Sequence, residues 1–171
     1  MSEEIRIYVA NLAAYNNGRL HGVWINATDD LDDMQDQINT MLKTTYDGLS
    51  EEYAIHNYEG FGGYRLGEYA GLETVHNIAC FIEEHGEIAG KLLNHFGGDL
   101  DDAKIAIEEN YSGCYSSLAE YAQEIAEEMG DIPQRLESYI DYERLGRDME
   151  LGGDVYTIET AFDEVHIFWA H

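Results

Sequence analysis

Hydrophobic and polar side chains alternate in two segments near the start of the chain. Residues 5–11 (IRIYVAN) and 20–26 (LHGVWIN) both carry this pattern, which is typical of strands with one buried face. The Asn-Asn-Gly sequence at 16–18 lies between them and favours a turn. These segments are therefore predicted to form a hairpin, and residues 52–58 (EYAIHNY) to form a third strand.

Apolar residues recur at helical spacing elsewhere. The first helix is predicted to follow the N-cap residues Thr28 and Asp29 and to run to about Leu42. Further helices are predicted over 72–85, over 87–96 and from the cap at Asp99 to about Asn110. A capping box at Ser117 and Glu120 begins another helix, which Gly130 ends. Helical pieces are expected after Pro133 and at 141–146, and two strands, 155–160 and 165–170, are expected to close the chain as a hairpin.

These elements predict an α+β protein built as an elongated chain of three small domains. Residues 1–61 are expected to form an α/β domain with a small antiparallel sheet. Residues 62–103, which begin in a glycine-rich segment, form a central helical domain. Residues 104–171 form a C-terminal domain of helices with a short antiparallel sheet.

The charge of the chain changes this picture. The 171 residues include 35 Asp and Glu against 9 Lys and Arg, which gives a formal net charge of -26. With 44% hydrophobic and 12% aromatic residues the composition is that of a folded protein rather than a disordered acidic tail. Two carboxylates 6 Å apart repel by roughly 0.7 kcal/mol even in water, so this charge opposes folding. It is far more than solubility requires.

The acidic residues form stripes on the predicted helices. On residues 118–129, acidic positions repeat every three or four residues opposite the apolar positions 118, 122, 125, 126 and 129. No basic residue occurs between Lys104 and Arg135, so these stripes lack compensating charges. The candidate partner-binding residues are Asp29, Asp30, Asp32, Asp33, Asp36, Glu73, Glu83, Glu84, Glu87, Asp101, Asp102, Glu108, Glu109, Glu120, Glu124, Glu127, Glu128 and Asp131.

Such stripes favour a protein that imitates the phosphates of DNA for a basic partner. A solvated acidic face, or the surface of a salt-adapted protein without mimicry, is the alternative that the sequence leaves open. Crowding of this kind is also expected to raise carboxylate pKa values on average.

Sites of chemistry are not indicated. The acidic segments lack the Gly and Glu of an EF-hand loop, and the seven histidines offer no zinc motif. Cys80 and Cys114 lie alone, and no phosphate-binding loop or nucleophile motif is present. We predict a non-enzyme without metal or cofactor. The N-terminus has no signal-peptide character and no segment is apolar enough to span a membrane, so a cytoplasmic protein with no membrane or nucleic-acid partner is expected.

Three segments resemble the ArdA family of antirestriction proteins: residues 7–26 (IYVANLAAYNNGRLHGVWIN), 51–61 (EEYAIHNYEGF) and 117–130 (SLAEYAQEIAEEMG). The resemblance extends to the ending VHIFWA. The third segment is similar to the family's antirestriction motif, which here comprises Leu118, Ala119, Glu120, Tyr121, Ala122, Glu124, Glu127 and Glu128.

The resemblance implies a function. Members of this family are carried by plasmids and conjugative transposons, and they are elongated dimers that imitate bent DNA in the groove of type I restriction-modification enzymes. It implies a competitive inhibitor and a homodimer whose contact lies in the C-terminal domain, where Tyr111, Tyr115 and Tyr121 are candidate contact residues. A binding module for another basic DNA-binding protein remains the alternative.

Overall fold

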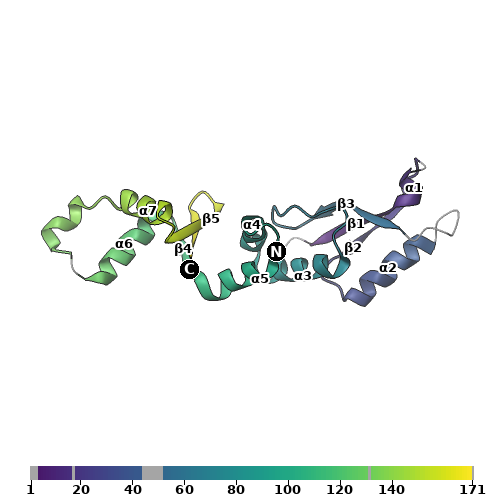
Figure 1. The fold of residues 1–171 in the computed structure, drawn as a ribbon, viewed down its shortest axis with the longest axis horizontal. Helices are drawn as coiled ribbons and strands as arrows, with labels where there is room; N and C mark the ends of the chain where they lie inside the picture. Colours follow the sequence, from purple (N-terminus) through teal and green to yellow (C-terminus); the bar gives the residue numbers. More distant parts are fainter. Residues whose placement is uncertain (1–3, 17, 44–51, 131, 171) are drawn as a thin grey trace. The chain divides into compact units, whose positions relative to one another are not determined.

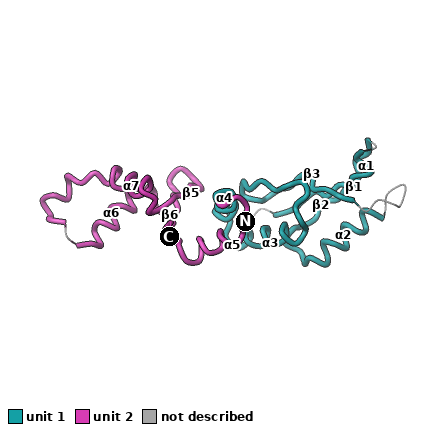
Figure 2. The backbone as a smooth tube through the Cα atoms, in the orientation of Figure 1, with its two compact units in different colours: residues 1–95 teal, residues 96–171 magenta. Residues whose placement is uncertain are grey.

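The computed structural model describes residues 4–16, 18–43, 52–130 and 132–170. The chain folds as two compact units, residues 1–95 and residues 96–171 (Figure 2). Both units combine helices with a three-stranded antiparallel sheet, which confirms the predicted α+β class. The division into three domains stays a prediction.

The sheet of the first unit has its first strand in the centre. Strand β1 (Arg6–Asn11) pairs antiparallel with β2 (Gly22–Asn26) on one side and with β3 (Tyr53–Glu59) on the other. Ile7, fully buried, lies opposite Ile25 in this register. The predicted hairpin and third strand are thus confirmed. The connection of the hairpin differs from a simple turn, because residues 12–16 form a short helix, α1 (Leu12–Asn16), and Asn17 lies outside the described residues.

Helix α2 (Leu31–Lys43) belongs to the first unit and buries the side chains of Met34, Ile38 and Met41 in its core. The predicted N-cap at Thr28 or Asp29 was wrong by one or two residues. Both residues lie in the turn before the helix, where the backbone N–H and the hydroxyl of Thr28 donate to Asn26 Oδ1 over 2.9 Å and 2.6 Å. The side chain of Asn26 therefore holds this turn, and the helix begins after Asp30.

Two helices complete the first unit (Figure 1). Helix α3 (Leu72–His85) buries Val75, Ile78 and Ile82 and ends at Gly86, whose φ of 78° is accessible to glycine. Helix α4 (Glu87–His95) follows without a loop. Both helices were predicted from the sequence, and their observed bounds agree with the prediction to within one residue.

The second unit begins with α5 (Leu100–Ile105), capped by Asp99, whose carboxylate accepts from the backbone N–H of Asp102 over 3.1 Å. The chain continues as a π-helical turn, η1 (Ala106–Asn110). A π-helical turn is wider than an α-helical one. In a continuous α-helix, Asp101 and Glu108 would lie seven residues, or about two turns, apart on one face. The wider π-helical turn breaks that spacing.

The second sheet has the order β4-β6-β5, from β4 (Tyr111–Tyr115), β5 (Val155–Ala161) and β6 (Glu164–Trp169). The C-terminal hairpin β5–β6 was predicted, whereas β4 was not. Between β4 and β5 lie α6 (Leu118–Met129), the 3-10 helix η2 (Gln134–Tyr139) and α7 (Tyr142–Leu151). Tyr121 of α6 packs with Val155, Val165 and Ile167 of the hairpin. This core fixes α6 against the sheet.

Candidate partner-binding surface

Helix α6 carries the antirestriction motif, and local residues set both of its ends. Ser117 is its N-cap, and the Ser117 hydroxyl accepts from the backbone N–H of Glu120 over 3.2 Å. Gly130 ends the helix in the left-handed conformation, with φ 71°. The predicted caps are confirmed, and they place the motif on a helix of defined length.

The apolar residues of the motif point into the core. Tyr121 and Ala122 are buried, at 2% and 0% exposed, while Leu118 and Ala119 are half-buried. Burial raises the pKa of the Tyr121 hydroxyl. Tyr121 and Ala122 therefore position the helix and offer almost no surface to a partner. Met129, predicted on the same apolar face, is 70% exposed, because it stands at the last position of the helix with no core beside it.

The carboxylate of Glu120 is anchored to the residue before the cap. Glu120 Oε2 accepts from the backbone N–H of Ser116 over 2.8 Å and also from the Ser116 hydroxyl. These two hydrogen bonds, first that from the hydroxyl, lower the pKa of the Glu120 carboxyl. In a capping box the Glu120 carboxylate would accept from the backbone N–H of Ser117. In the structure it accepts from Ser116 instead, so that half of the predicted box was wrong.

Glu124 is held from the neighbouring strand. The hydroxyl of Tyr115, the last residue of β4, donates to Glu124 Oε2. This hydrogen bond raises the pKa of the Tyr115 hydroxyl well above its usual value. Sequence spacing gave no signal for the pair, because the pair depends on a strand that the pattern of residues 111–115 did not indicate.

One turn further along α6, Glu127 accepts from Gln123 Nε2 over 3.2 Å. Glu120, Glu124 and Glu127 line one shallow hollow together with Tyr115 and Gln123. Glu128 is exposed beside it. Residues three or four apart on a helix lie about 5–6 Å from each other. The hollow therefore presents several carboxylates to one approaching group, which suits a lysine or arginine side chain.

The first unit carries its own acidic groups on exposed positions. Asp30 precedes α2, Asp32, Asp33 and Asp36 lie on it, and all four are exposed. Asp29 is half-buried in the preceding turn and is not part of the helical stripe.

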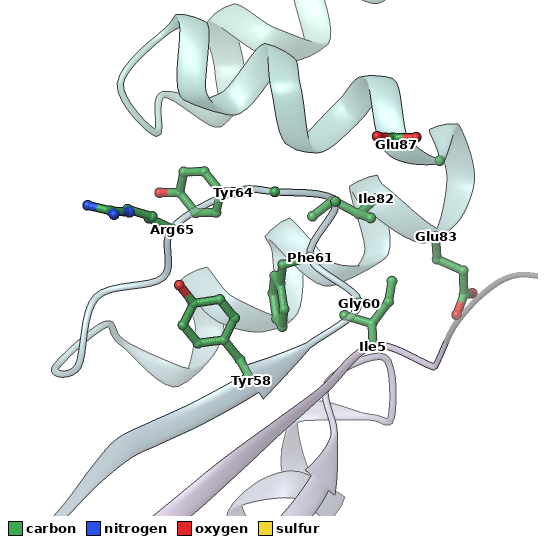
Figure 3. A pocket seen from close by; sticks show the side chains of 12 residues that line it. Ile5, Tyr58, Gly60, Phe61, Tyr64, Arg65, Ile82, Glu83 and Glu87 are labelled. Atoms are coloured by element: carbon green, nitrogen blue, oxygen red, sulfur yellow. The ribbon is translucent and has the colours of Figure 1, made fainter. Parts of the chain in front are cut away.

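Glu73, Glu83 and Glu84 of α3 and Glu87 at the start of α4 are exposed as well. Glu83 and Glu87 lie at one end of a hollow with an apolar floor of Phe61 and Ile82 (Figure 3). Arg65 lies at the other end of this hollow and forms no ion pair with either acid (Figure 3).

The remaining acidic candidates belong to the second unit. Asp101, Asp102, Glu108 and Glu109 are exposed on α5 and η1. Asp131 lies outside the described residues. The two units are thus each provided with several exposed acidic groups.

Compensating charges are scarce on these surfaces. Within the described part of the chain, no lysine or arginine forms an ion pair with any of the candidate carboxylates. Glu84 Oε2 lies 3.7 Å from His85 Nε2, and an arginine–carboxylate pair joins Arg6 to Glu59 on the first sheet. An ordinary solvated helix would gain stability from Glu–Lys pairs, and these helices lack them.

The three tyrosines expected at a subunit contact differ in exposure. Tyr111 is 39% exposed, Tyr115 is half-buried, and Tyr121 is in the core of its own unit. Tyr121 therefore has no side-chain surface left for a second subunit, and a contact through Tyr111 or Tyr115 stays a prediction.

Comparison with known families shows which family the chain belongs to. The sequence matches the family model for the antirestriction protein ArdA over residues 7–164. The chain belongs to the ArdA family. Membership in ArdA implies an antirestriction function, and the family is not known for enzymatic activity. A comparison with curated proteins finds no match.

The ArdA match begins at the second residue of β1 and ends at the first residue of β6. It therefore covers all of α6 with its acidic hollow. Among the described residues, no helix has the length and apolar character needed to cross a membrane.

Proposed function

We propose that this ArdA protein is an acidic DNA mimic that occupies the DNA-binding groove of a type I restriction-modification enzyme and inhibits the enzyme by competition. The observation that carries the proposal is the row of exposed carboxylates on α6, held in place by Tyr115 and Ser116 and uncompensated by basic neighbours. The acidic groups of α2, α3 and α5 extend the same character to other surfaces.

The physical basis is the exchange of phosphates for carboxylates. A DNA-binding groove uses lysine and arginine to neutralise phosphates, which advance about 3.4 Å per charge along each strand. Glutamates three or four residues apart on a helix, with Cβ atoms about 5–6 Å apart, present negative charge at a similar scale. They offer the groove no base edges to read and no phosphodiester to cut, so the enzyme is occupied without turnover.

Fixed side chains make this mimicry more effective. A free glutamate loses rotamer entropy when a partner immobilises it. Glu120 and Glu124 already accept hydrogen bonds from Ser116 and Tyr115, so part of that loss occurs on folding. The hydrogen bonds leave carboxylate lone pairs available to a partner's cations.

The protein is further proposed to act as a homodimer. Exposed Tyr111 and half-buried Tyr115 lie on β4, at one edge of the second sheet. An edge strand offers unpaired backbone groups to a second chain. Pairing of two such edges would place two copies of α6 in one particle.

The proposal is tested by neutralising α6. A variant with Glu124→Gln, Glu127→Gln and Glu128→Gln should inhibit a purified type I enzyme at least about tenfold less well, because several phosphate-like contacts are lost. The matched control neutralises three exposed acids of the same unit outside the stripe, Glu143→Gln, Asp148→Asn and Asp163→Asn. Equal losses in the two variants would show that only total charge matters.

A second variant separates position from charge. Tyr115→Phe keeps every carboxylate but frees Glu124 from its hydroxyl partner. Inhibition should weaken about two- to fivefold, because Glu124 must then be ordered on binding. Unchanged inhibition by this variant would contradict the claim that Tyr115 aids binding by holding Glu124. The claim that the carboxylate charges bind the enzyme would still be decided by the triple variant.

A further inference from the structure

The hollow beside α3 in the first unit (Figure 3) carries opposite charges at its two ends. Its volume is about 730 Å³, which lies within the range of small-ligand sites. Glu83 and Glu87, both exposed, lie at one end, and exposed Arg65 lies at the other. The hollow therefore attracts a cation at one end and an anion at the other.

The surface between the charged ends is apolar and aromatic. Phe61 and Ile82, both buried, form the floor, and the ring of Tyr58 stands edge-on to Phe61 with the centroids 5.6 Å apart. The hydroxyl of Tyr58 points toward the Arg65 end (Figure 3). A phenol donates a hydrogen bond, so this end suits an anion, while the floor suits an apolar group.

The glycine-rich loop that forms one wall is held in place by the protein itself. The backbone N–H of Tyr64 donates to the carbonyl oxygen of Phe61 over 3.0 Å, and Asn94 Nδ2 of α4 donates to that of Gly63 over 2.8 Å. A Cβ at Gly63 or Gly86 would meet nothing within 4 Å, so the hollow is open beside these glycines. A preformed and accessible site of this kind requires little ordering when a ligand binds.

We propose that this hollow binds short peptides with free termini. The N-terminal ammonium lies against Glu83 and Glu87, and the C-terminal carboxylate lies against Arg65. An apolar side chain between them contacts Phe61 and Ile82. The proposal stands independently of DNA mimicry.

The separation of the charges favours a peptide over a free amino acid. An amino acid carries its ammonium and its carboxylate on one carbon, so it cannot reach both ends of the floor. A hollow of this volume is roughly 9 Å across, which an extended peptide of about three residues spans at 3.3–3.6 Å per residue.

The test titrates the full, isotopically labelled chain with the tripeptide Ala-Leu-Ala and follows the amide signals by NMR. The conditions are about pH 6.5, where both peptide termini are charged, and about 0.15 M salt, which screens long-range attraction. The amides of Gly62, Gly63 and Gly86, which line the hollow, should shift with saturation. Those of Gly113 and Gly146 in the second unit should not shift.

Blocked peptides separate the site from the net charge of the protein. Acetylation of the N-terminus, or amidation of the C-terminus, should each weaken binding about two- to fivefold, because one charge contact is lost. The amidated peptide is a cation, so attraction to a chain of charge -26 alone would make it bind more tightly than the free peptide. The hollow predicts the reverse order.

Matched variants assign the two ends. Arg65→Gln should remove the preference for a free carboxylate, whereas Arg19→Gln removes the same charge outside the hollow and should keep it. Glu83→Gln combined with Glu87→Gln should remove the preference for a free ammonium. Glu84→Gln, on the same helix as Glu83 but outside the hollow, should keep it.

Tighter binding of the amidated peptide than of the free peptide would overturn the proposal. Shifts spread over both units, or shifts that do not saturate, would overturn it as well. These comparisons use the natural sequence, so they decide the matter even if a variant does not fold. A preference for the free carboxylate that persists in Arg65→Gln would contradict the assigned anion end.

Discussion

Glu120 shows how one side chain departs from the average behaviour of an acidic protein. Crowding of carboxylates was expected to raise their pKa values, yet the pKa of Glu120 is lowered, because Ser116 donates two hydrogen bonds to it. At this residue the hydrogen bonds from Ser116 therefore outweigh the repulsion expected from other carboxylates. The sequence located the cap at Ser117 because capping depends on neighbours in the chain. It did not indicate Tyr115 as a partner of Glu124, because that contact needs the tertiary fold.

Glu120 and Glu128 should respond to substitution with opposite signs. Glu120 lies in the first turn of α6, where the helix dipole and Ser116 both favour its charge, whereas Glu128 lies in the last turn, where the dipole disfavours a negative charge. At neutral pH, Glu120→Gln should lower the Tm, and Glu128→Gln should raise it by about 1–4 °C. Thermal unfolding followed by circular dichroism measures both.

The pH dependence of the Glu120 effect follows from the lowered pKa. A carboxyl whose folded pKa is below its unfolded value contributes stability above the unfolded pKa, about 4.5 for this group. That contribution is lost as the pH falls through the folded value. The Tm difference between Glu120→Gln and the natural sequence should therefore be full at pH 6–7 and shrink below about pH 4.5. A difference that is constant with pH would mean that the carboxylate charge is not the cause.

At the scale of elements, the predicted ends of α3 and α6 were right, whereas strand β4 was missed. The ends of α3 and α6 follow from Gly86, Ser117 and Gly130, which act on their own helix. Strand β4 has no clear alternation, contains Gly113 at φ 137°, and exists because it pairs with β6. The π-helical turn before it has no signature in the sequence that we can identify.

Helix α4 depends on a glycine whose role is visible only in the packed unit. A Cβ at Gly90 would lie 2.6 Å from the carbonyl oxygen of Phe61 and would also clash with that of Gly62. Gly90→Ala should therefore destabilise the protein by about 1–3 kcal/mol, although alanine is the better helix former by about 1 kcal/mol. Denaturant unfolding measures the change in free energy.

Gly67→Ala is the matched control, because nothing lies within 4 Å of a Cβ there. Its free energy of unfolding should change by less than about 0.5 kcal/mol. If Gly90→Ala proved as stable as this control, the close approach of the 61–62 backbone to α4 would be contradicted.

At the scale of the whole molecule, a net charge of -26 should make stability depend on salt. The Debye length falls to about 10 Å at 0.1 M salt, so repulsion between different stripes is screened first. The Tm at pH 7 should rise with sodium chloride up to a few tenths molar. A Tm that is indifferent to salt would mean that the acidic surfaces are already neutralised by basic neighbours.

The measurement that tests DNA mimicry most directly is an equilibrium competition. A labelled DNA duplex bound to a purified type I restriction-modification enzyme is titrated with the protein, and the release of DNA is followed by fluorescence anisotropy at several salt concentrations. The account predicts complete displacement, with an affinity for the enzyme that falls steeply as salt rises, because neutralisation of charge dominates the contact. Simultaneous binding of protein and DNA, or an affinity independent of salt, would contradict it.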